Sequence, residues 1–493
     1  MRLQELVSVL PGVKVSGCAD LEISNIVYDS RKATAGSMFV AVNGETVDGH
    51  EYAEAAVRNG AVAVIAERAI PNIQPHNIEL ILVKNSRDAM GSLAARFYDY
   101  PSRKLKLIGV TGTKGKTTTT YLIASVLRSQ SQLTGVIGTI GTRIGDEAIH
   151  TEHTTPESVD LQGVLAQMAG RGVQTVAMEV SSHGLAQGRV RGCEFDCGIF
   201  TNLTRDHLDY HETMEDYLDA KLMLFQDYAL ASSKEFTAVL NVDDPAAPKV
   251  LNAVKGRLIT YGVKSAADIT ASNIKATAKG VSYTLSYGGE SIEAQLKLAG
   301  LFNVYNSLAA ASAAIAQGLS ISQIAEGLAG AENVDGRFES IDCGQDFTAL
   351  VDYAHAPDAL ENVLAAARDL TKGRLIVVFG CGGNRDRGKR PIMGRIASEM
   401  ADVCVVTSDN PRKEDPNTII EEILTGIEKP FAARVVVEPD RREAIKIALN
   451  MANAGDIVLI AGKGHEDYQI FADRTIHFDD REVVRELLRS QKR

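Results

Sequence analysis

Tryptophan is absent from the sequence, and only 5% of its 493 residues are aromatic, so stacking on a ligand would depend on Phe, Tyr or His. An excess of positive charge is absent too, because the formal net charge is −11. Binding to nucleic acid or to an anionic membrane needs a broad basic face. We therefore expect neither partner, and an anionic substrate would have to be met by local Lys, Arg and helix N-termini.

Cysteine is scarce, and long hydrophobic runs are missing. The six cysteines contain no C-x-x-C pair; they are Cys18, Cys193, Cys197, Cys343, Cys381 and Cys404. This spacing is typical of reduced cytosolic thiols rather than of a disulfide framework or a zinc site. The longest apolar runs, in "RLIVVFG" and "DIVLIAG", are far shorter than the ~20 residues that span a bilayer. The N-terminus does not resemble a signal peptide, so we expect a cytoplasmic protein.

Length and patterning predict three α/β domains, at residues 1–100, 101–334 and 335–493. In the first, short β-like runs such as "SMFVAVNG" alternate with helix-like runs. In the second, continuous apolar strands between helices favour a mostly parallel sheet, and "DITASNIKATAKGVSYTLSYGGESIEAQLKL" predicts antiparallel strands appended to it. The helix predicted for "SISQIAEGLAG" opens with Ser at its N-cap. In the third, "RLIVVFG", "DVCVVTS", "ARVVVEP" and "DIVLIAG" predict the strands of a Rossmann-like domain.

The stretch "KLIGVTGTKGKTTTTYLIASVL", residues 106–127, predicts a phosphate-binding loop. A loop with Gly112 and Gly115 leads from an apolar strand through Lys116 into a helix. Glycines let backbone N–H groups turn inward, Lys116 can reach the outer phosphates, and Thr117 can ligate Mg²⁺. A plain strand-to-helix turn would not need Lys-Thr directly after the second glycine. Val110 stands where the general G-x-x-x-x-G-K-[ST] pattern has its first glycine, so the loop is not of the general type.

Further along the chain, Glu179, His207 and Lys221 are candidate functional residues next to this loop. "AMEVSSHGLAQGRV" places Glu179 at the carboxyl end of a predicted strand, where α/β proteins bind ligands and where a carboxylate suits Mg²⁺. "TNLTRDHLDYHETMEDYLDAKLMLF" contains His207 and Lys221. Taken singly, each has an ordinary alternative: Glu179 as a capping or solvated residue, His207 as a structural histidine, and Lys221 as an exposed lysine.

The segments "TGTKGKTTT", "EVSSHGL" and "NLTRDHLDYH" through "DAKLMLF" resemble, in order, motifs of the Mur ligase family of peptidoglycan synthesis, to which the folylpolyglutamate synthetases are related. The resemblance implies ATP and Mg²⁺ as cofactors and a CO₂-derived carbamate on Lys221. The metal ligands it implies are Thr117, Glu179, His207 and carbamylated Lys221. The catalytic residues are then Lys116, Glu179, His207 and Lys221. The ATP-binding residues it implies are Gly112, Thr113, Lys114, Gly115, Lys116, Thr117, Thr118, Asn303, Arg337, Asp352 and His355.

Two further segments resemble the nucleotide-sugar site of the family member that adds the third peptide residue. They are "VYDSRKATAGSMFVAVNGETVDGH", in the domain that would bind uridine, and "HTTPES". For the Thr-Thr-Pro turn alone, an ordinary loop is the alternative. The resemblance implies UDP-MurNAc-L-Ala-D-Glu as a substrate. Its binding residues would be Tyr28, Asp29, Ser30, Thr154, Thr155, Ser181, Gln187 and Arg189.

Three loops of the third domain, "GCGGNRDRGKRP", "SDNPRKEDP" and "AGKGHEDYQ", each follow a predicted strand. The first lacks G-x-G-x-x-G spacing, so it is not a dinucleotide fingerprint. Arg385, Arg412 and Glu466 supply the cations and the anion that an amino-acid substrate requires. "DNPR" resembles the signature of relatives that accept meso-diaminopimelate, whose second carboxylate needs a cation. The implied site is Arg385, Asp409, Asn410, Pro411, Arg412, Gly462 and Glu466.

Together these resemblances imply a monomeric ATP-dependent ligase. It would join meso-diaminopimelate to the D-glutamate γ-carboxylate of UDP-MurNAc-L-Ala-D-Glu through an acyl phosphate. Within the family, addition of L-lysine or another Mur step is the alternative. A P-loop kinase or switch would leave the third domain without a role, and a scaffold without catalysis would bind ATP but release no phosphate. The base that deprotonates the amine is not evident from the sequence; His207 or a metal-bound water could serve.

Overall fold

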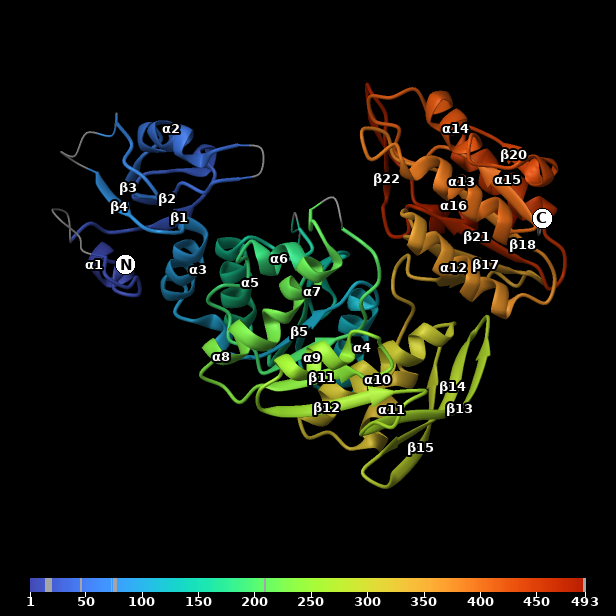
Figure 1. The fold of residues 1–493 in the computed structure, drawn as a ribbon, viewed down its shortest axis with the longest axis horizontal. Coiled ribbons are helices and arrows are strands. Elements are labelled where there is room, and N and C mark those ends of the chain that lie inside the picture. Colours follow the sequence, from blue (N-terminus) through green and yellow to red (C-terminus); the bar gives the residue numbers. More distant parts are fainter. Residues whose placement is uncertain are drawn as a thin grey trace. The chain divides into compact units, whose positions relative to one another are not determined.

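The computed structural model describes residues 1–13, 20–44, 47–71, 73, 78–149, 151, 153–207 and 210–490, so Cys18 lies outside the described residues. The chain divides into two compact units, and Figure 1 labels their helices and strands. The first comprises residues 1–261 and 312–318, and the second comprises residues 262–311 and 319–493. Both are α/β, as predicted. The domain boundaries predicted near residues 100 and 334 stay a prediction.

The first unit begins with a parallel sheet of order β1-β2-β3-β4. Met38 and Val40 of β2 face one core, whereas Phe39 faces another, because successive strand residues point to opposite faces. Both faces are therefore buried, as a parallel sheet requires. The elements are α1 (Leu3–Val7), β1 (Asn25–Val27), η1 (Ser30–Lys32), β2 (Ser37–Val40), η2 (Gly49–Tyr52), α2 (Ala53–Arg58), β3 (Ala61–Ala66), β4 (Glu79–Leu82) and α3 (Ser86–Phe97).

The rest of the first unit surrounds a sheet of order β12-β11-β10-β5-β9-β6-β7-β8. Its strands are parallel except for β7 and β8, which form an antiparallel edge. The carboxyl ends of the neighbouring strands β5 and β9 bring the phosphate loop beside Glu179. The strands are β5 (Lys106–Thr111), β6 (Thr134–Gly138), β7 (Gly141–Ile144), β8 (Glu147–Ile149), β9 (Thr175–Glu179), β10 (Cys197–Phe200), β11 (Thr237–Asn241) and β12 (Arg257–Gly262). The helices are η3 (Pro101–Lys104), α4 (Lys116–Ser129), α5 (Ser158–Gly170), α6 (Ser182–Ala186), α7 (Met214–Leu222), η4 (Leu224–Tyr228), α8 (Ala229–Ala231) and α9 (Ala247–Ala253).

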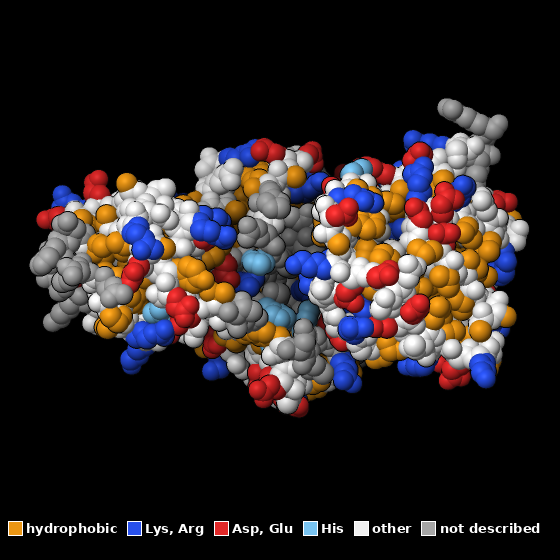
Figure 2. Space-filling model, turned by 90° about the horizontal axis from the view of Figure 1, so that it is seen from above, with side chains coloured by type: hydrophobic (Ala, Val, Ile, Leu, Met, Phe, Trp, Pro, Cys, Tyr) orange, Lys and Arg blue, Asp and Glu red, His pale blue; other side chains and the backbone are white. Residues whose placement is uncertain are grey.

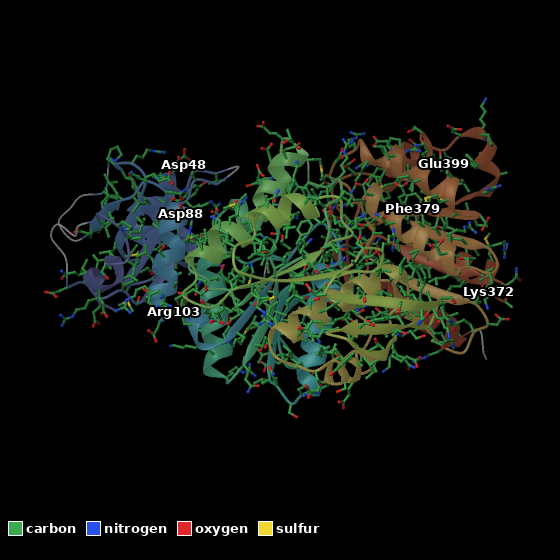
Figure 3. The ribbon with its side chains drawn as sticks, turned by 60° about the horizontal axis from the view of Figure 1, so that its bottom comes forward. Asp48, Asp88, Arg103, Lys372, Phe379 and Glu399 are labelled. Atoms are coloured by element: carbon green, nitrogen blue, oxygen red, sulfur yellow. The ribbon has the colours of Figure 1, made fainter. Side chains whose placement is uncertain are left out.

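One ion pair links α3 to the segment between α6 and β10, and a second links η3 to the same segment. Asp88 of α3 and Arg103 of η3 are both labelled in Figure 3. Arg191 Nε donates to Asp88 Oδ1 over 3.0 Å, and Arg103 Nε donates to Glu194 Oε1 over 2.7 Å. A Cβ on Gly91 of α3 would lie 2.5 Å from Cβ of Arg191, so only glycine permits this close approach. The N-terminal sheet and the phosphate loop therefore belong to one compact unit.

The second unit opens with the antiparallel meander β13 (Ile269–Thr277), β14 (Gly280–Tyr287) and β15 (Glu290–Leu296), which confirms the antiparallel strands expected there. Helix α10 (Leu301–Ala316), which belongs to this unit up to Ala311, and helix α11 (Ile321–Ala329) follow. The hydroxyl of Ser320 caps α11 by accepting a hydrogen bond from the backbone N–H of Gln323, as the sequence predicts.

The C-terminal sheet has the order β16-β17-β21-β18-β19-β20 and is parallel except for β16. In β18, Val377 and Phe379 face the core that they share with α12, α13 and α14, whereas Ile376 and Val378 face the core that they share with α15 and α16. The strands are β16 (Glu339–Ile341), β17 (Thr348–Asp352), β18 (Leu375–Phe379), β19 (Val403–Val406), β20 (Val435–Val437), β21 (Ile457–Ala461), β22 (Tyr468–Ile470) and β23 (Thr475–His477). The helices are α12 (Pro357–Leu370), α13 (Lys389–Met400), α14 (Pro416–Leu424), η5 (Lys429–Arg434), α15 (Arg441–Met451) and α16 (Asp480–Ser490).

On the face shown in Figure 2, Lys and Arg side chains are interspersed with Asp and Glu, and the described residues there form no continuous basic band. This distribution agrees with the formal charge of −11. Among the described residues, no helix combines the length and the hydrophobicity needed to cross a membrane.

Candidate active site

The phosphate loop, residues 112–115, joins β5 to the N-terminus of α4. Gly112 and Gly115 have φ values of 142° and 85°, which favour glycine. A Cβ on Gly112 would lie 2.0 Å from the hydroxyl oxygen of Thr201. The backbone N–H groups of Thr113 and Lys114 donate to the carbonyl and to the side-chain oxygen of Asn202, each over 2.9 Å. The segment after β10 thus holds the loop, a role of Asn202 that the sequence analysis missed.

Two lysines meet at one carbonyl of this loop. Lys116 Nζ donates to the carbonyls of Gly112 and Thr113, over 3.0 and 2.8 Å, and Lys221 Nζ donates to the same Gly112 carbonyl over 2.9 Å. Lys221 is buried, with its amine 4.1 Å from the centre of the Tyr217 ring. Burial, and then the charge of Lys116, lower the pKa of Lys221 well below its ordinary value. The neutral amine so favoured is the form that reacts with CO₂.

Glu179 is buried at the carboxyl end of β9 and is held on several sides. Its Oε1 accepts from the Thr117 hydroxyl and from the Thr139 N–H, each over 2.8 Å, and its Oε2 accepts from the Thr139 hydroxyl over 3.1 Å. Thr118 is also buried, in the first turn of α4. A hydroxyl beside a carboxylate is a donor set that suits Mg²⁺, which prefers hard oxygen ligands.

His207 lies in a cluster of rings that includes His183 and Tyr217. Its backbone is left-handed, with φ of 53°, and its ring centre is 4.9 Å from that of His183 and 6.1 Å from that of Tyr217. The described residues contain no group of three or more His, Cys, Asp or Glu side chains placed to hold a metal ion. The metal site predicted at Thr117, Glu179, His207 and Lys221 stays a prediction.

Most of the residues expected to hold the nucleotide-sugar peptide form a second hydrogen-bond network, which reaches the backbone carbonyl of Glu179. The Thr155 hydroxyl donates to the Glu179 carbonyl over 2.9 Å and accepts from the Ser181 N–H over 3.0 Å. Arg189 donates to the Thr155 carbonyl over 3.1 Å and to Gln187 Oε1 over 2.7 Å. The Thr154 hydroxyl lies 3.2 Å from that of Thr139, which itself binds Glu179. These residues are therefore brought together around one strand end.

Tyr28, Asp29 and Ser30 lie by the N-terminal sheet instead. The Tyr28 hydroxyl donates to Asp160 Oδ2 over 2.5 Å. Asp29 caps η1 by accepting from the Arg31 N–H over 2.9 Å, and the buried Ser30 accepts at its carbonyl from Asn59 over 2.9 Å. Asp29 and Ser30 thus set the shape of the turn that follows β1.

The ATP-contact residues expected in the second unit fall into two places. Asn303 is buried in α10 and donates to the Ala299 carbonyl over 2.7 Å. Arg337 and His355 flank Tyr353, which the sequence analysis missed: the Arg337 guanidinium is 4.9 Å from the Tyr353 ring centre, and the His355 ring is 4.5 Å from it. Asp352 Oδ2 accepts from the Phe338 N–H over 2.7 Å, which fixes the backbone next to Arg337.

The residues predicted to bind the amino-acid substrate lie on loops of the second unit that contact one another. Asn410 Nδ2 donates to Glu466 Oε2 over 2.8 Å. Arg412 has φ of 55° and donates to the Gly383 carbonyl over 2.9 Å. A Cβ on Gly383 would lie 1.8 Å from the carbonyl oxygen of Pro411, so glycine allows the first two loops to touch. The structure therefore brings the "DNPR" loop against both of its neighbours.

The remaining predicted residues differ in burial. Asp409 is buried, and its Oδ1 accepts from the Asn410 N–H over 2.7 Å. A Cβ on Gly462, whose φ is 119°, would lie 2.8 Å from Asp409 Oδ2. Arg385 is exposed and donates to the Asn384 carbonyl over 3.1 Å. Arg385 therefore belongs to the same loop cluster but has its side chain in solvent.

Lys463 occupies the centre of this cluster and was missed by the sequence analysis. Its side chain is fully buried, and its Nζ donates to Glu466 Oε2 over 3.1 Å and to the Tyr468 carbonyl over 2.5 Å. The position of "GKGHE" directly after a strand was the only sequence signal that could have found it. Because a lysine in a loop is normally exposed, that signal alone does not predict burial.

Comparisons with known proteins cover nearly the whole chain. Three family models match: "Mur ligase family, catalytic domain" over residues 22–98, "Mur ligase middle domain" over residues 110–314, and "Mur ligase, glutamate ligase domain" over residues 336–464.

Among curated relatives, the UDP-N-acetylmuramoyl-L-alanyl-D-glutamate–2,6-diaminopimelate ligase of Geobacillus thermodenitrificans is 48% identical, with 100% of both chains covered. The ligase of the same name from Bacillus licheniformis is 46% identical, over 98% of this chain and 99% of its own. A solved structure of a ligase of that name is 35% identical, with a TM-score of 0.72 and full coverage of both chains. MurF from Acinetobacter baumannii, at 22% identity and a TM-score of 0.65 over 94% of this chain and 95% of its own, shares the fold. Motifs in all three matched regions, full-length relatives and the shared fold agree: the chain belongs to the Mur ligase family.

Proposed function

We propose that this chain is an ATP-dependent ligase that joins meso-diaminopimelate to the D-glutamate γ-carboxylate of UDP-MurNAc-L-Ala-D-Glu, in cytoplasmic peptidoglycan synthesis. The observation that carries the proposal is the contact between the "DNPR" loop and Glu466, made through Asn410. This contact places the guanidinium of Arg412, which can bind a substrate carboxylate, on a loop next to the carboxylate of Glu466, which can bind a substrate ammonium. Full-length relatives at 45–48% identity carry the name of a 2,6-diaminopimelate ligase, which supports the same substrate.

ATP as the nucleotide is supported by the loop geometry and by relatives. MurF of Thermotoga maritima was solved with ADP, and folylpolyglutamate synthase of Mycobacterium tuberculosis with ADP and AMPPCP. In this chain, backbone N–H groups of residues 115–118, at the N-terminus of α4, would bind the phosphates. Lys116 would turn from the carbonyls of Gly112 and Thr113 to the outer phosphates.

Mg²⁺ would be held by Thr117, Glu179, His207 and the carbamate of Lys221. When bound, it would offset the charge on the phosphates during transfer. The chain keeps Glu179 in place through Thr117 and Thr139, so its carboxylate does not have to reorganise. Isotope-labelled bicarbonate tests the carbamate: the label should attach to the wild-type protein and not to Lys221→Met.

The proposed reaction has two steps. The γ-phosphate of ATP passes to the carboxylate of D-glutamate and gives an acyl phosphate, because a free carboxylate is a poor electrophile. The amine of diaminopimelate then attacks the acyl carbon, and inorganic phosphate leaves. Arg385, Arg412, Asn410 and Glu466 would orient the amino acid, with Arg412 binding the carboxylate that lysine lacks. His207 stays a candidate for the base.

One assay tests the proposal: phosphate release from ATP with UDP-MurNAc-L-Ala-D-Glu and either diaminopimelate, lysine or no amino acid. We expect turnover with diaminopimelate and little in the other two mixtures. Faster turnover with lysine would assign the chain to lysine addition. Turnover without an amino acid would indicate a kinase or a switch. The monomeric state and the absence of nucleic-acid and membrane partners stay predictions.

A further inference from the structure

A buried ion pair lies beneath the proposed amino-acid site. Arg441, the first residue of α15, is 1% exposed, and Asp480, the first residue of α16, is 0% exposed. Arg441 Nε donates to Asp480 Oδ1 over 2.8 Å, and Arg441 Nη2 donates to Asp480 Oδ2 over 2.7 Å. A guanidinium carries five N–H donors, so this two-point contact leaves Arg441 able to bind other acceptors.

Those other acceptors are backbone carbonyls at two strand ends. Arg441 Nη1 donates to the Ser408 carbonyl over 3.2 Å, and Arg441 Nη2 donates to the Ala461 carbonyl over 3.0 Å. Ser408 follows β19 and precedes Asp409, whereas Ala461 ends β21 and precedes Gly462. One side chain therefore holds both segments that carry proposed amino-acid ligands.

The sheet itself does not join these two segments. Its order is β21-β18-β19, so β18 lies between them, and Phe379 marks its carboxyl end (Figure 3). Ladder hydrogen bonds run from β18 to β19 and from β18 to β21. Arg441 bridges from β19 to β21 across the end of β18. Its length and planar fork suit this role, because the guanidinium can bind Asp480 and both carbonyls at once.

The contact between Asn410 and Glu466, in the same two segments, depends on that spacing. Asn410 Nδ2 donates to Glu466 Oε2 over 2.8 Å, and the Ile470 N–H donates to Asn410 Oδ1 over 3.0 Å. A relative shift of the segments would separate Asn410 from Glu466.

We propose that Arg441 is a positioning residue for the amino-acid site, with Asp480 as its buried counter-ion. By binding the carbonyls of Ser408 and Ala461, it fixes the separation of Asn410 and Glu466. This inference rests on the proposed function and deepens it, because Arg441 acts on the diaminopimelate site without touching the substrate.

Two variants and one control separate positioning from general stability. Arg441→Lys keeps the charge but offers a single ammonium in place of the fork. The double variant Arg441→Met with Asp480→Leu removes both charges, which avoids leaving one of them buried alone. The control is Arg374→Lys. Arg374 donates to Asp456 over 3.1 and 2.8 Å at the opposite end of the same sheet, next to the start of β21.

The measurement is phosphate release by the full-length enzyme, with KM determined for diaminopimelate and for ATP below the thermal unfolding of each variant. We expect the Arg441 variants to raise the KM for diaminopimelate about tenfold and to change the KM for ATP less than about twofold. The Arg374→Lys control should change neither. An unchanged KM for diaminopimelate in both Arg441 variants, or an equal rise in both KM values, would overturn the inference. If the wild-type enzyme shows no turnover that depends on diaminopimelate, the proposed function fails first, and the inference fails with it.

Discussion

Gly138 provides a sharp test of the site because it leaves no room for a side chain. It ends β6 next to Glu179, and a Cβ built on it would lie 2.3 Å from Glu179 Oε1 and 2.9 Å from Cδ. Ordinary contacts of a Cβ begin at 3.4 Å. In Gly138→Ala the carboxylate must therefore move by about 1 Å.

That movement breaks the contacts that hold Glu179. Its Oε1 accepts from the Thr117 hydroxyl and the Thr139 N–H, each over 2.8 Å. Hydrogen bonds to a charged group contribute about 1.5 to 3 kcal/mol each, and solvent or new partners will replace part of this, so we expect a loss of roughly 2 to 4 kcal/mol in unfolding free energy. Misplacing a catalytic group by about 1 Å lowers the rate by roughly 100-fold.

Phosphate release at saturating substrates, titrated with Mg²⁺, measures this effect, and urea unfolding measures the stability. We expect a lower kcat and a higher requirement for Mg²⁺. The matched control is Gly170→Ala at the end of α5, where a Cβ would meet nothing within 4 Å. It should leave activity unchanged and stabilise the helix slightly. If Gly138→Ala kept wild-type kcat and Mg²⁺ dependence, the role assigned to Glu179 would be wrong.

Three further predictions concern the second unit. Arg412→Lys should weaken the binding of diaminopimelate by about 1.5 to 3 kcal/mol, which the phosphate-release assay detects as a higher KM for diaminopimelate. The response to lysine should not change. An unchanged KM for diaminopimelate would contradict the role of Arg412. Lys463→Met removes the ammonium that lies 3.1 Å from Glu466, so the KM for diaminopimelate should rise while that for ATP stays the same; equal changes in both would indicate a structural role only. Burial, and then Arg337, lower the pKa of His465 from 6.5 to about 4. As pH falls from 6.5 toward 4, the unfolded chain takes up this proton first, and folded stability is lost. In urea unfolding, His465→Gln should therefore lose roughly 2 kcal/mol less than the wild type between pH 7 and about pH 4.5, and an identical loss would refute the assignment.

The strands of the C-terminal sheet could be predicted because their residues serve two cores. In "RLIVVFG", which contains β18, Val377 and Val378 point to opposite faces that are both buried, so the strand is a continuous apolar run. The phosphate loop was equally clear, since Gly112 and Gly115 have backbone angles that favour glycine. Features such as a buried apolar strand or a glycine-rich loop can be predicted because neighbouring residues in the sequence determine their backbone conformation.

Residues that act through distant neighbours could not be predicted. Asn202 binds the phosphate loop only because β10 lies beside β5. Lys463 and Arg441 are buried cations whose partners come from other loops and helices, and no local pattern distinguishes them from exposed charges. The roles proposed for the substrate-binding residues stay predictions until they are tested.

The two hydrogen bonds from Lys116 to its own loop make nucleotide binding an exchange reaction. In the proposed binding of ATP, the amine would leave the carbonyls of Gly112 and Thr113 and turn to a phosphate, so the affinity for ATP would be the difference between the new contacts and these two. Lys221 donates to the same Gly112 carbonyl. Conversion of Lys221 to a carbamate would place a negative charge next to that N–H donor, and Lys116 would then become the main cation beside the loop. The proposed carbamylation would therefore affect the affinity for ATP through the carbonyl oxygen of Gly112.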